Sequence, residues 1–294
     1  MTTVGIAGGL SVDHLVTEGA GVRFRVLGGP GLFAALGART VAGTQVRLHT
    51  ALPDDEPTFE SLFRSAGVAM EFCARTPYAS RLWILNSTEG RRILPTASPD
   101  GLEVVGKVEH EESAGTAPDE FYRGLEGLLL SSPQMSRPSS KRARVVGVDP
   151  DQREVMRHGL DYWLAMAEQA TVLLPSRVQL AQPGQDPGDA AVMISLATGV
   201  PVIARLDVDG LLVVDGDRAW SVQDPEVRVV DTIGAGDASA AAIVAALAGG
   251  SSLVEAAAFG ASVARLILSD WGHAGLLRDE PLTRPYETLI TKEL

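Results

Sequence analysis

The sequence of 294 residues has very little cysteine and no cluster of histidines. Cys73 is its single cysteine, so the chain cannot form an internal disulfide. The five histidines are scattered without the spacing of metal ligands. The sequence therefore excludes a disulfide scaffold and gives no indication of a zinc site.

Long apolar runs and a basic leader segment are also missing. No stretch approaches the roughly 18 consecutive apolar residues of a membrane span. The nearest candidate, residues 238–248, is rich in small side chains and is interpreted as a buried helix. The N-terminus, residues 1–10, lacks the basic and long apolar regions of a secretory signal. We therefore expect a cytoplasmic protein that does not enter a membrane.

Positive charge is scarce as well. The chain has 25 Lys and Arg residues against 37 Asp and Glu residues, which gives a formal net charge of −12. Such an acidic chain disfavours sequence-independent binding to nucleic acid or to anionic membranes. Neither a P-loop string nor a Gly-x-Ser-x-Gly string occurs. Any anionic ligand must therefore be bound locally, by a few well-placed groups.

What the sequence does contain is the alternating pattern of an α/β protein. Strands are predicted at residues 4–7, 22–27, 46–51, 125–130, 145–148, 172–174, 200–204 and 211–214, and helices at residues 31–41, 59–66, 154–169 and 189–198. This alternation predicts a mostly parallel sheet covered by helices on both faces. Two strand-like segments within residues 80–94 predict a hairpin, which is a candidate lid. No internal boundary is evident, so residues 1–294 are expected to form one domain.

The most informative segment, residues 227–247, is predicted to contain a strand, a glycine-rich turn and an alanine-rich helix. Gly234 and Gly236 permit close backbone approaches that a Cβ would penalise. Successive amides at this helix start, including that of Ala235, form a concavity suited to a phosphate. Asp237 lies in the same turn, where a carboxylate can accept the proton of an attacking hydroxyl. The pattern indicates phosphoryl transfer, although a plain turn with a capping Asp would also contain a Gly-x-Gly.

The complete string Asp-Thr-Ile-Gly-Ala-Gly-Asp at residues 231–237 resembles the C-terminal signature of the ribokinase-like carbohydrate kinases, also called the PfkB family. Gly28-Gly29 followed by a helix resembles the N-terminal diglycine signature of that family. The resemblance implies a ribokinase-like α/β fold, with a central mostly parallel β-sheet flanked by helices. It also implies a small β lid formed by segments within about residues 10–28 and 78–96.

By this resemblance, the protein is an ATP-dependent kinase that phosphorylates a hydroxymethyl group of a sugar or nucleoside-like small molecule. Asp237 is the implied catalytic base, and the amides of Gly234, Ala235 and Gly236 are implied to hold the transferred phosphate. The implied substrate-binding residues are Asp13, Gly28, Gly29 and Phe33. The implied residues on the nucleotide side are Ser176, Arg205, Asp207, Gly210 and Thr232.

The same resemblance implies cofactors and partners. ATP and Mg²⁺ are the expected cofactors, and a monovalent cation is implied near the backbone of residues 231–234. The expected partner is a small-molecule sugar or nucleoside substrate, with no nucleic acid. Dimerisation of two copies through the lid is also implied.

Several residues depart from the family pattern. Phe33 stands where the family usually has an Asn that contacts the substrate, and this change predicts a less polar acceptor, such as one that carries a base or an aromatic group. Ser176 and Gln179 stand in place of an Asn-x-x-Glu that helps to organise magnesium and phosphate oxygens. Arg205 and Asp207 stand where a Thr-Leu-Gly-x-x-Gly segment places small neutral residues, so that Arg205 can pair with phosphates or Asp207 can repel them.

These departures support other functions. One alternative is a ribokinase-fold protein with lost or repurposed kinase activity, which binds a ligand, regulates a partner or catalyses different chemistry. Another is a kinase whose donor is not ATP. A third hypothesis comes from residues 29–34, which fit the Gly-x-Gly-x-x-Gly/Ala pattern of dinucleotide-binding proteins. That turn should follow the first strand of the sheet, whereas here a strand and a polar segment come earlier.

Overall fold

The computed structural model describes residues 1–19, 21–87, 90–96, 115–133, 135, 143–181 and 186–294. Within them the main sheet has nine strands in the order β15-β14-β13-β12-β11-β10-β9-β1-β4. The strands are β1 (Thr2–Ala7), β4 (Thr44–His49), β9 (Gly127–Ser131), β10 (Val145–Asp149), β11 (Val172–Leu173), β12 (Val202–Arg205), β13 (Leu211–Asp215), β14 (Arg218–Gln223) and β15 (Ile290–Glu293). Pairing is parallel from β4 to β12 and antiparallel from β12 to β15. The predicted mostly parallel sheet is confirmed.

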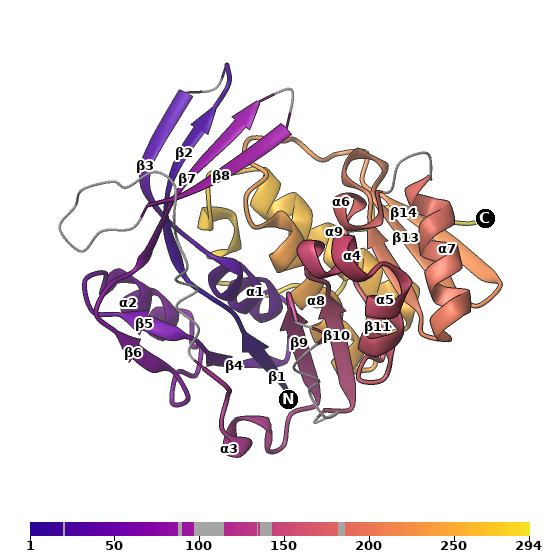
Figure 1. The fold of residues 1–294 in the computed structure, drawn as a ribbon, viewed down its shortest axis with the longest axis horizontal. Coiled ribbons are helices and arrows are strands. Elements are labelled where there is room, and N and C mark those ends of the chain that lie inside the picture. The colour runs from indigo at the N-terminus through magenta and orange to yellow at the C-terminus, as the bar shows by residue number, and fades with distance from the viewer. Residues whose placement is uncertain (20, 88–89, 97–114, 134, 136–142, 182–185) are drawn as a thin grey trace.

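Helices cover both faces of this sheet (Figure 1). They are α1 (Pro30–Arg39), α2 (Thr58–Ser65), α3 (Asp119–Tyr122), α4 (Gln152–His158), α5 (Leu160–Ala167), α6 (Arg177–Leu180), α7 (Pro187–Thr198), α8 (Ala235–Gly249) and α9 (Leu253–Leu268), with 3₁₀ turns η1 (Asp207–Asp209) and η2 (Ala274–Leu276). Around β11, Val172 and Leu174 pack into the core formed with α1, α8 and α9. Leu173 packs into the core formed with α4, α5, α6 and α7. Successive side chains point to opposite faces of a strand, which explains why each core receives alternate residues.

Helix α8 is the central helix of the first core, and small residues let α1 approach it closely. Ala240 through Ala246 are all nearly or completely buried. A Cβ on Gly37 of α1 would lie only 2.5 Å from the Cα of Ala238, so the two backbones are in direct contact at this point. The alanine-rich sequence thus lets the N-terminal part of α8 pack directly against α1.

A separate sheet of four strands, the small sheet, projects from the main body (Figure 1). Its order is β3 (Gly21–Gly28), β2 (Ser11–Thr17), β7 (Ser80–Ser87) and β8 (Gly90–Thr96). β7 and β8 are antiparallel, so the predicted hairpin is present. Two short strands, β5 (Ala51–Pro53) and β6 (Ala74–Thr76), pair in parallel near α2.

Two predicted elements differ from the structure. The single helix expected over residues 154–169 is two helices, α4 and α5, because Gly159 between them has a φ of +53°. Residues 227–230 are not a strand. Val230 and Asp231 instead donate their amides to the carbonyl of Leu268, at 2.7 and 3.4 Å, so the segment is held by the end of α9 rather than by a sheet edge.

Residues 109–112, an acidic run of the sequence that includes His110, one of the five scattered histidines, lie outside the described residues. Among the helices in the described ranges, none is long and apolar enough to cross a membrane.

Candidate active site

The candidate site lies at the carboxyl ends of the parallel strands. Asp149 ends β10 and Arg205 ends β12, and both side chains are nearly buried. Ligands of open α/β sheets bind outside these ends, where loops and helix N-termini meet. The N-terminus of α8 reaches the same place, because Arg205 Nη1 donates to the carbonyl of Gly236 at 2.6 Å.

The glycine-rich turn has the geometry of an anion hole. Gly234 caps α8 with a φ of +74°, a left-handed conformation that favours glycine. The Ala238 amide makes a helical hydrogen bond to the Gly234 carbonyl at 2.9 Å, so the helix begins directly after the turn. The first amides of a helix lack helical acceptors and point toward its N-terminal end, where the dipole favours an anion. Asp237 lies half-buried in this first turn.

Phe33 packs directly against the turn. Its side chain is 1% exposed, and a Cβ on Gly234 would overlap atoms of its ring. The structure therefore brings together α1, which begins at the diglycine turn, and the first residue of the anion hole. Glycine is required at position 234 for two reasons, the positive φ and the adjacent aromatic ring.

Asp231 holds the turn from the other side, a role that the sequence analysis did not assign. Its carboxylate is 6% exposed and accepts the amides of Ile233 and Gly272, both at 3.1 Å. The loop around Gly272 also touches the small sheet, because Arg23 of β3 lies over the Trp271 ring at 4.6 Å. Asp231 thus links the anion hole to the base of the small sheet.

The acceptor side is formed by β2 and the diglycine turn. Asp13 is 2% exposed, and its Oδ1 has no hydrogen-bond partner in the described part of the chain. Burial raises the pKa of Asp13 to about 6, and the charge of Asp231 adds to the shift. A Cβ on Gly28 would collide with the Asp13 carboxylate and would lie 3.2 Å from the Ser11 hydroxyl. Gly28 therefore leaves space for two buried polar groups.

Ser11 is a residue that the sequence analysis missed. Its hydroxyl oxygen is buried, and within the described residues it has no hydrogen-bond partner. Ser11 and Asp13 are two residues apart on one strand, so they share a face. The pairing of a hydroxyl with an acid at this spacing was the available signal.

Gly29 allows the diglycine turn to adopt its backbone conformation. It has a φ of +96°, and a Cβ there would lie 2.6 Å from the Gly9 carbonyl oxygen. The turn follows β3 of the small sheet rather than a strand of the main sheet. The dinucleotide-binding hypothesis for this turn is therefore not supported, since that turn should lead from the central sheet.

Arg205 forms a buried ion pair beside the anion hole. Its Nη2 donates to Asp149 Oδ1 at 2.7 Å and to the Leu174 carbonyl at 2.6 Å. Gln179 Nε2 donates to the same Asp149 oxygen at 3.3 Å. The guanidinium therefore joins two strand ends to the first turn of α8. Its partners were not predicted, because Asp149 lies 56 residues earlier in the chain.

Ser176 and Thr232, also expected on the nucleotide side, are connected to the site through hydrogen bonds of their backbones. The Ser176 amide donates to Gln179 Oε1 at 2.6 Å, and Ser176 bridges to Arg205 through the backbone. Thr232 is exposed, and its carbonyl accepts the Ala235 amide at 3.4 Å. Asp207 and Gly210 lie against Arg177 and β14, and the structure does not bring them to the anion hole.

Asp207 and Gly210 belong to the turn between β12 and β13. The Asp207 side chain is 65% exposed and lies 3.3 Å from Arg177 Nε, so a cation already compensates its charge. A Cβ on Gly210 would collide with the Val222 carbonyl oxygen, and the residue has a φ of +79°. Gly210 is thus required by the close approach of β14.

The described residues do not form a cage for Mg²⁺. They contain no group of three or more His, Cys, Asp or Glu side chains able to hold a metal ion. Positions 176 and 179 carry no acid, and the Asp149 oxygen nearest to them is held by Arg205 and Gln179. Because Mg²⁺ needs oxygen ligands with ideal geometry, this donor set does not fit a metal bound by protein carboxylates.

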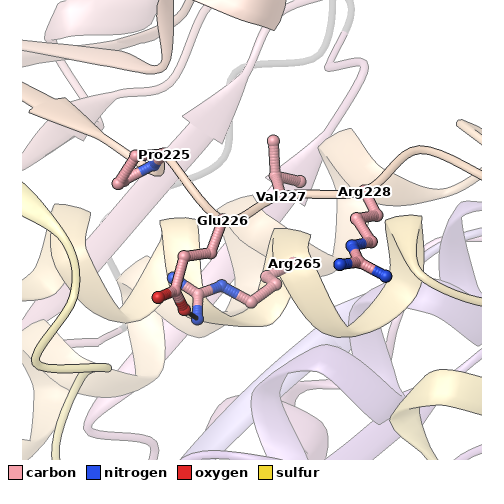
Figure 2. Close-up of a pocket in the computed structure, with 5 residues that line it drawn as sticks. All are labelled: Pro225, Glu226, Val227, Arg228 and Arg265. Carbon is pink, nitrogen blue, oxygen red and sulfur yellow. Dashed lines mark hydrogen bonds and ion pairs between the residues drawn. The ribbon is translucent and has the colours of Figure 1, made fainter.

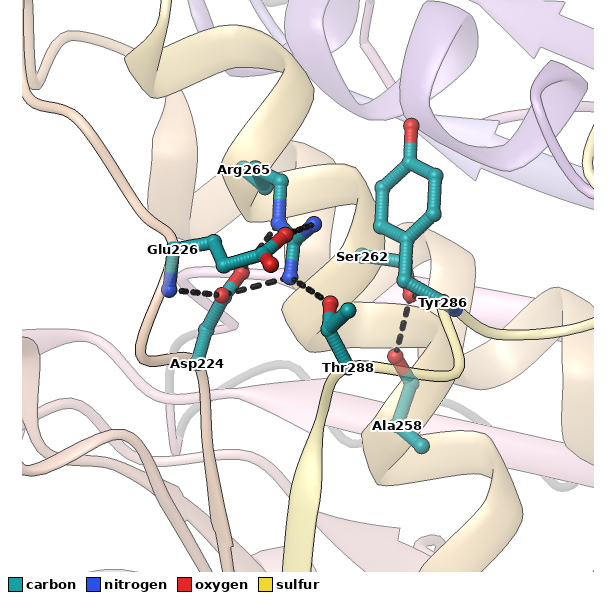
Figure 3. Close-up of polar contacts among 7 residues, drawn as sticks. All are labelled: Asp224, Glu226, Ala258, Ser262, Arg265, Tyr286 and Thr288. Carbon is teal, nitrogen blue, oxygen red and sulfur yellow. Dashed lines mark hydrogen bonds and ion pairs between the residues drawn. The ribbon is translucent and has the colours of Figure 1, made fainter.

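A hollow of about 550 Å³ lies elsewhere, over α9 and the segment that leads to α8 (Figure 2). It is lined by Pro225, Glu226, Val227, Arg228 and Arg265. Arg265 is not available to a ligand, because it donates to both oxygens of Asp224 at 2.6 Å and to Thr288 at 2.8 Å (Figure 3). The Asp224 carboxylate and hydrogen bonds raise the pKa of Arg265. This cluster ties the C-terminal segment to α9 and is a structural feature.

Comparison with known proteins agrees with this geometry. A family model described as pfkB family carbohydrate kinase matches residues 14–277. The uncharacterized sugar kinase YegV of Escherichia coli K12 is 39% identical over 75 residues, which cover 26% of this chain and only 22% of that protein. The chain therefore aligns with less than a quarter of this curated relative.

Two solved structures share the fold at low sequence identity. Aminoimidazole riboside kinase from Salmonella enterica, complexed with aminoimidazole riboside and an ATP analogue, has a TM-score of 0.72 and 17% identity, over 94% of this chain and 96% of that chain. Ribokinase from Cryptococcus neoformans, in complex with ADP, has a TM-score of 0.68 and 17% identity, over 94% and 97%. The expected ribokinase-like fold is confirmed. Since the family model matches most of the sequence, the chain belongs to the pfkB family of carbohydrate kinases.

Proposed function

We propose that this protein transfers a phosphoryl group from ATP to a hydroxymethyl group of a sugar or nucleoside-like molecule. The observation that carries the proposal is the start of α8, where Gly234 in a left-handed conformation is followed by a helix with Asp237 in its first turn. The amides of Gly234, Ala235 and Gly236 hold the transferred phosphate, and the helix dipole stabilises its charge.

Asp237 acts as the general base in this proposal. A hydroxyl that attacks phosphorus must lose its proton, and a carboxylate within hydrogen-bond distance supplies the acceptor. The proposal is supported by the position of Asp237 in the first turn of α8, the same turn whose amides are proposed to hold the phosphate. The helix dipole favours its ionised form there.

The acceptor is oriented by Asp13 with Gly28 and Gly29. The buried Oδ1 of Asp13 has no hydrogen-bond partner among the residues that the structure describes, so it is suited to a substrate hydroxyl, since a buried polar atom without a partner is unfavourable. Phe33 replaces a polar side chain with a buried ring beside Gly234. We therefore propose an acceptor that carries a base or an aromatic group. A screen in which only free pentoses or hexoses react would contradict this last step.

Mg²⁺ is proposed to enter with ATP, where it neutralises phosphate charge while held by phosphates and waters. A monovalent cation near residues 231–234, and a homodimer formed through the small sheet acting as a lid, remain predictions. The exposed apolar side chains of Phe24 and Ile93, at 65% and 53%, lie on this sheet and are consistent with such an interface.

Asp237→Asn tests the proposal. The amide preserves size but cannot accept the proton, so we expect turnover to fall by about 10²–10⁴-fold. ATP and acceptor affinities, measured by calorimetry, should stay within a few-fold of those of the wild type. Unchanged turnover in a folded variant would contradict the role of Asp237.

A second candidate function is a binding or regulatory protein with lost kinase activity. The observation that favours it is the ion pair of Arg205 and Asp149, which occupies the donor side of the site. Comparing the wild type with Asp237→Asn separates the two functions. A kinase shows acceptor-dependent ADP release that the variant largely loses, whereas a binding protein shows ligand affinity but no such release in either protein.

A further inference from the structure

Arg205 is a permanent charge placed at an electrostatically unfavourable position. A guanidinium stays protonated at all physiological pH values. Its Nη1 contacts the first turn of α8 through the Gly236 carbonyl at 2.6 Å. A cation near a helix N-terminus is repelled by the helix dipole, which favours anions there. The fold therefore holds two sources of positive potential together.

The charge is also held rigidly. Arg205 is 9% exposed and uses three acceptors, while its Nε is buried and, among the described residues, has no partner. Asp149 compensates the charge from the side of β10, and Gln179 holds Asp149 in turn. The position of a Cβ on Gly236 would be 3.0 Å from Arg205 Nη1, so the guanidinium is adjacent to the glycine-rich turn itself.

Of the two members of the Arg205–Asp149 ion pair, the cation is the one in contact with the glycine-rich turn. Arg205 bonds to Gly236 directly, whereas Asp149 is bound through Arg205 and Gln179. The cation of the pair, rather than the carboxylate, is therefore adjacent to the glycine-rich turn. Because the Arg205 side chain is buried, its fixed charge contributes more than it would in bulk solvent.

We propose that Arg205 is a positioning residue and supplies the fixed positive charge of the phosphate site. With this charge in place, the site binds phosphate groups without requiring a divalent metal. This inference rests on the proposed function, because it concerns the same anion hole. It accounts for a donor set that offers Mg²⁺ no carboxylate cage. Arg205 orients the Gly236 peptide and adds positive potential to it, while Asp149 limits that potential.

Binding of tripolyphosphate in the presence of EDTA, followed by calorimetry, tests this role without any turnover. We expect the wild-type protein to bind this probe without metal. Arg205→Gln should weaken binding at least tenfold, and Arg205→Lys should recover part of the loss. Arg177→Gln is the matched control, because the hydrogen bonds and ion pairs of Arg177 within the described residues go to the turn of the same hairpin, through the Leu206 carbonyl, Asp207 and Asp209. It should stay within twofold of the wild type.

Asp149 variants distinguish an electrostatic role from a purely structural one. Asp149→Asn removes the compensating charge and should tighten tripolyphosphate binding severalfold, whereas a purely structural pair predicts weaker binding. The double variant Arg205→Gln/Asp149→Asn contains no unpaired buried charge, so it keeps the test valid if Arg205→Gln alone fails to fold. It should bind at least tenfold more weakly than the wild type.

Three results would overturn the inference. They are unchanged binding in the folded double variant, weaker binding in Asp149→Asn, and wild-type binding that appears only when Mg²⁺ is added. Failure of the proposed function would give a different result. Tripolyphosphate binding would still depend on Arg205, but no acceptor would cause ADP release. That result would contradict the kinase function and leave the role of Arg205 in anion binding intact.

Discussion

Replacing Gly234 with Ala should show that the anion hole and the diglycine helix are coupled through Phe33. Two penalties are expected. An L-residue in the left-handed conformation at a φ of +74° costs about 1–2 kcal/mol. The new methyl group also overlaps the Phe33 ring, which is 1% exposed and belongs to the main hydrophobic core. Such overpacking costs about 1–3 kcal/mol. The free energy of unfolding should therefore fall by about 2–5 kcal/mol.

Gly250 provides the matched control at the other end of α8. It has a φ of +100°, but a Cβ there would meet nothing within 4 Å. Gly250→Ala should therefore show only the backbone penalty of about 1–2 kcal/mol. Urea denaturation followed by circular dichroism measures both variants under the same conditions.

A double-mutant cycle isolates the contact with the ring. Phe33→Ala alone should cost about 3–5 kcal/mol, because a large buried side chain is lost. In that background Gly234→Ala should cost only the backbone penalty, so the cycle should yield a coupling of about 1–3 kcal/mol. Additive effects, together with equal costs for Gly234→Ala and Gly250→Ala, would refute the reasoning.

Further predictions concern charge. Burial raises the Asp13 pKa from 3.8 to about 6. Between these pH values the native state binds a proton that the unfolded state has released. The free energy of unfolding should therefore fall by about 3 kcal/mol as the pH rises through that interval. Asp13→Asn should remove this fall in urea denaturation at a series of pH values, and an unchanged pH profile would contradict it. Arg265→Met should destabilise by about 3–5 kcal/mol, since it leaves the 10% exposed Asp224 carboxylate unpaired. Glu226→Gln should cost only about 0–1 kcal/mol, because that side chain is 55% exposed, and thermal unfolding that shows equal effects would refute the assignment.

The sequence predicted the fold and the glycine-rich turn because both depend on local patterns. The alternation of strands and helices predicted the parallel sheet, and the string at residues 231–237 predicted where α8 begins. The same local reasoning failed where tertiary contacts decide. Val229 and Val230 favour a strand, yet the segment lies on α9 and is 61% and 42% exposed at these residues. Gly159 divides a helical pattern that periodicity alone continues.

The polar contacts of the site depend on distant parts of the chain. Arg205 could be predicted to meet phosphates or to pair with protein groups. Its ion pair with Asp149 needs β10 and β12, which flank β11, to end at the same edge of the sheet. Asp231 could be identified in the motif, but its bond to Gly272 joins residues 41 positions apart. The residue types therefore indicated which positions belong to the site, whereas the sequence did not indicate which groups those residues bond to.

The most direct test of the account is acceptor-dependent ADP release from ATP, measured in a coupled assay with a panel of sugars and nucleosides. The wild-type protein should release ADP only with an acceptor that bears a hydroxymethyl group, and Asp237→Asn should lower the rate of that release by about 10²–10⁴-fold. ATP binding that no acceptor on the panel converts into ADP release, or release at the wild-type rate in Asp237→Asn, would contradict phosphoryl transfer at the N-terminus of α8.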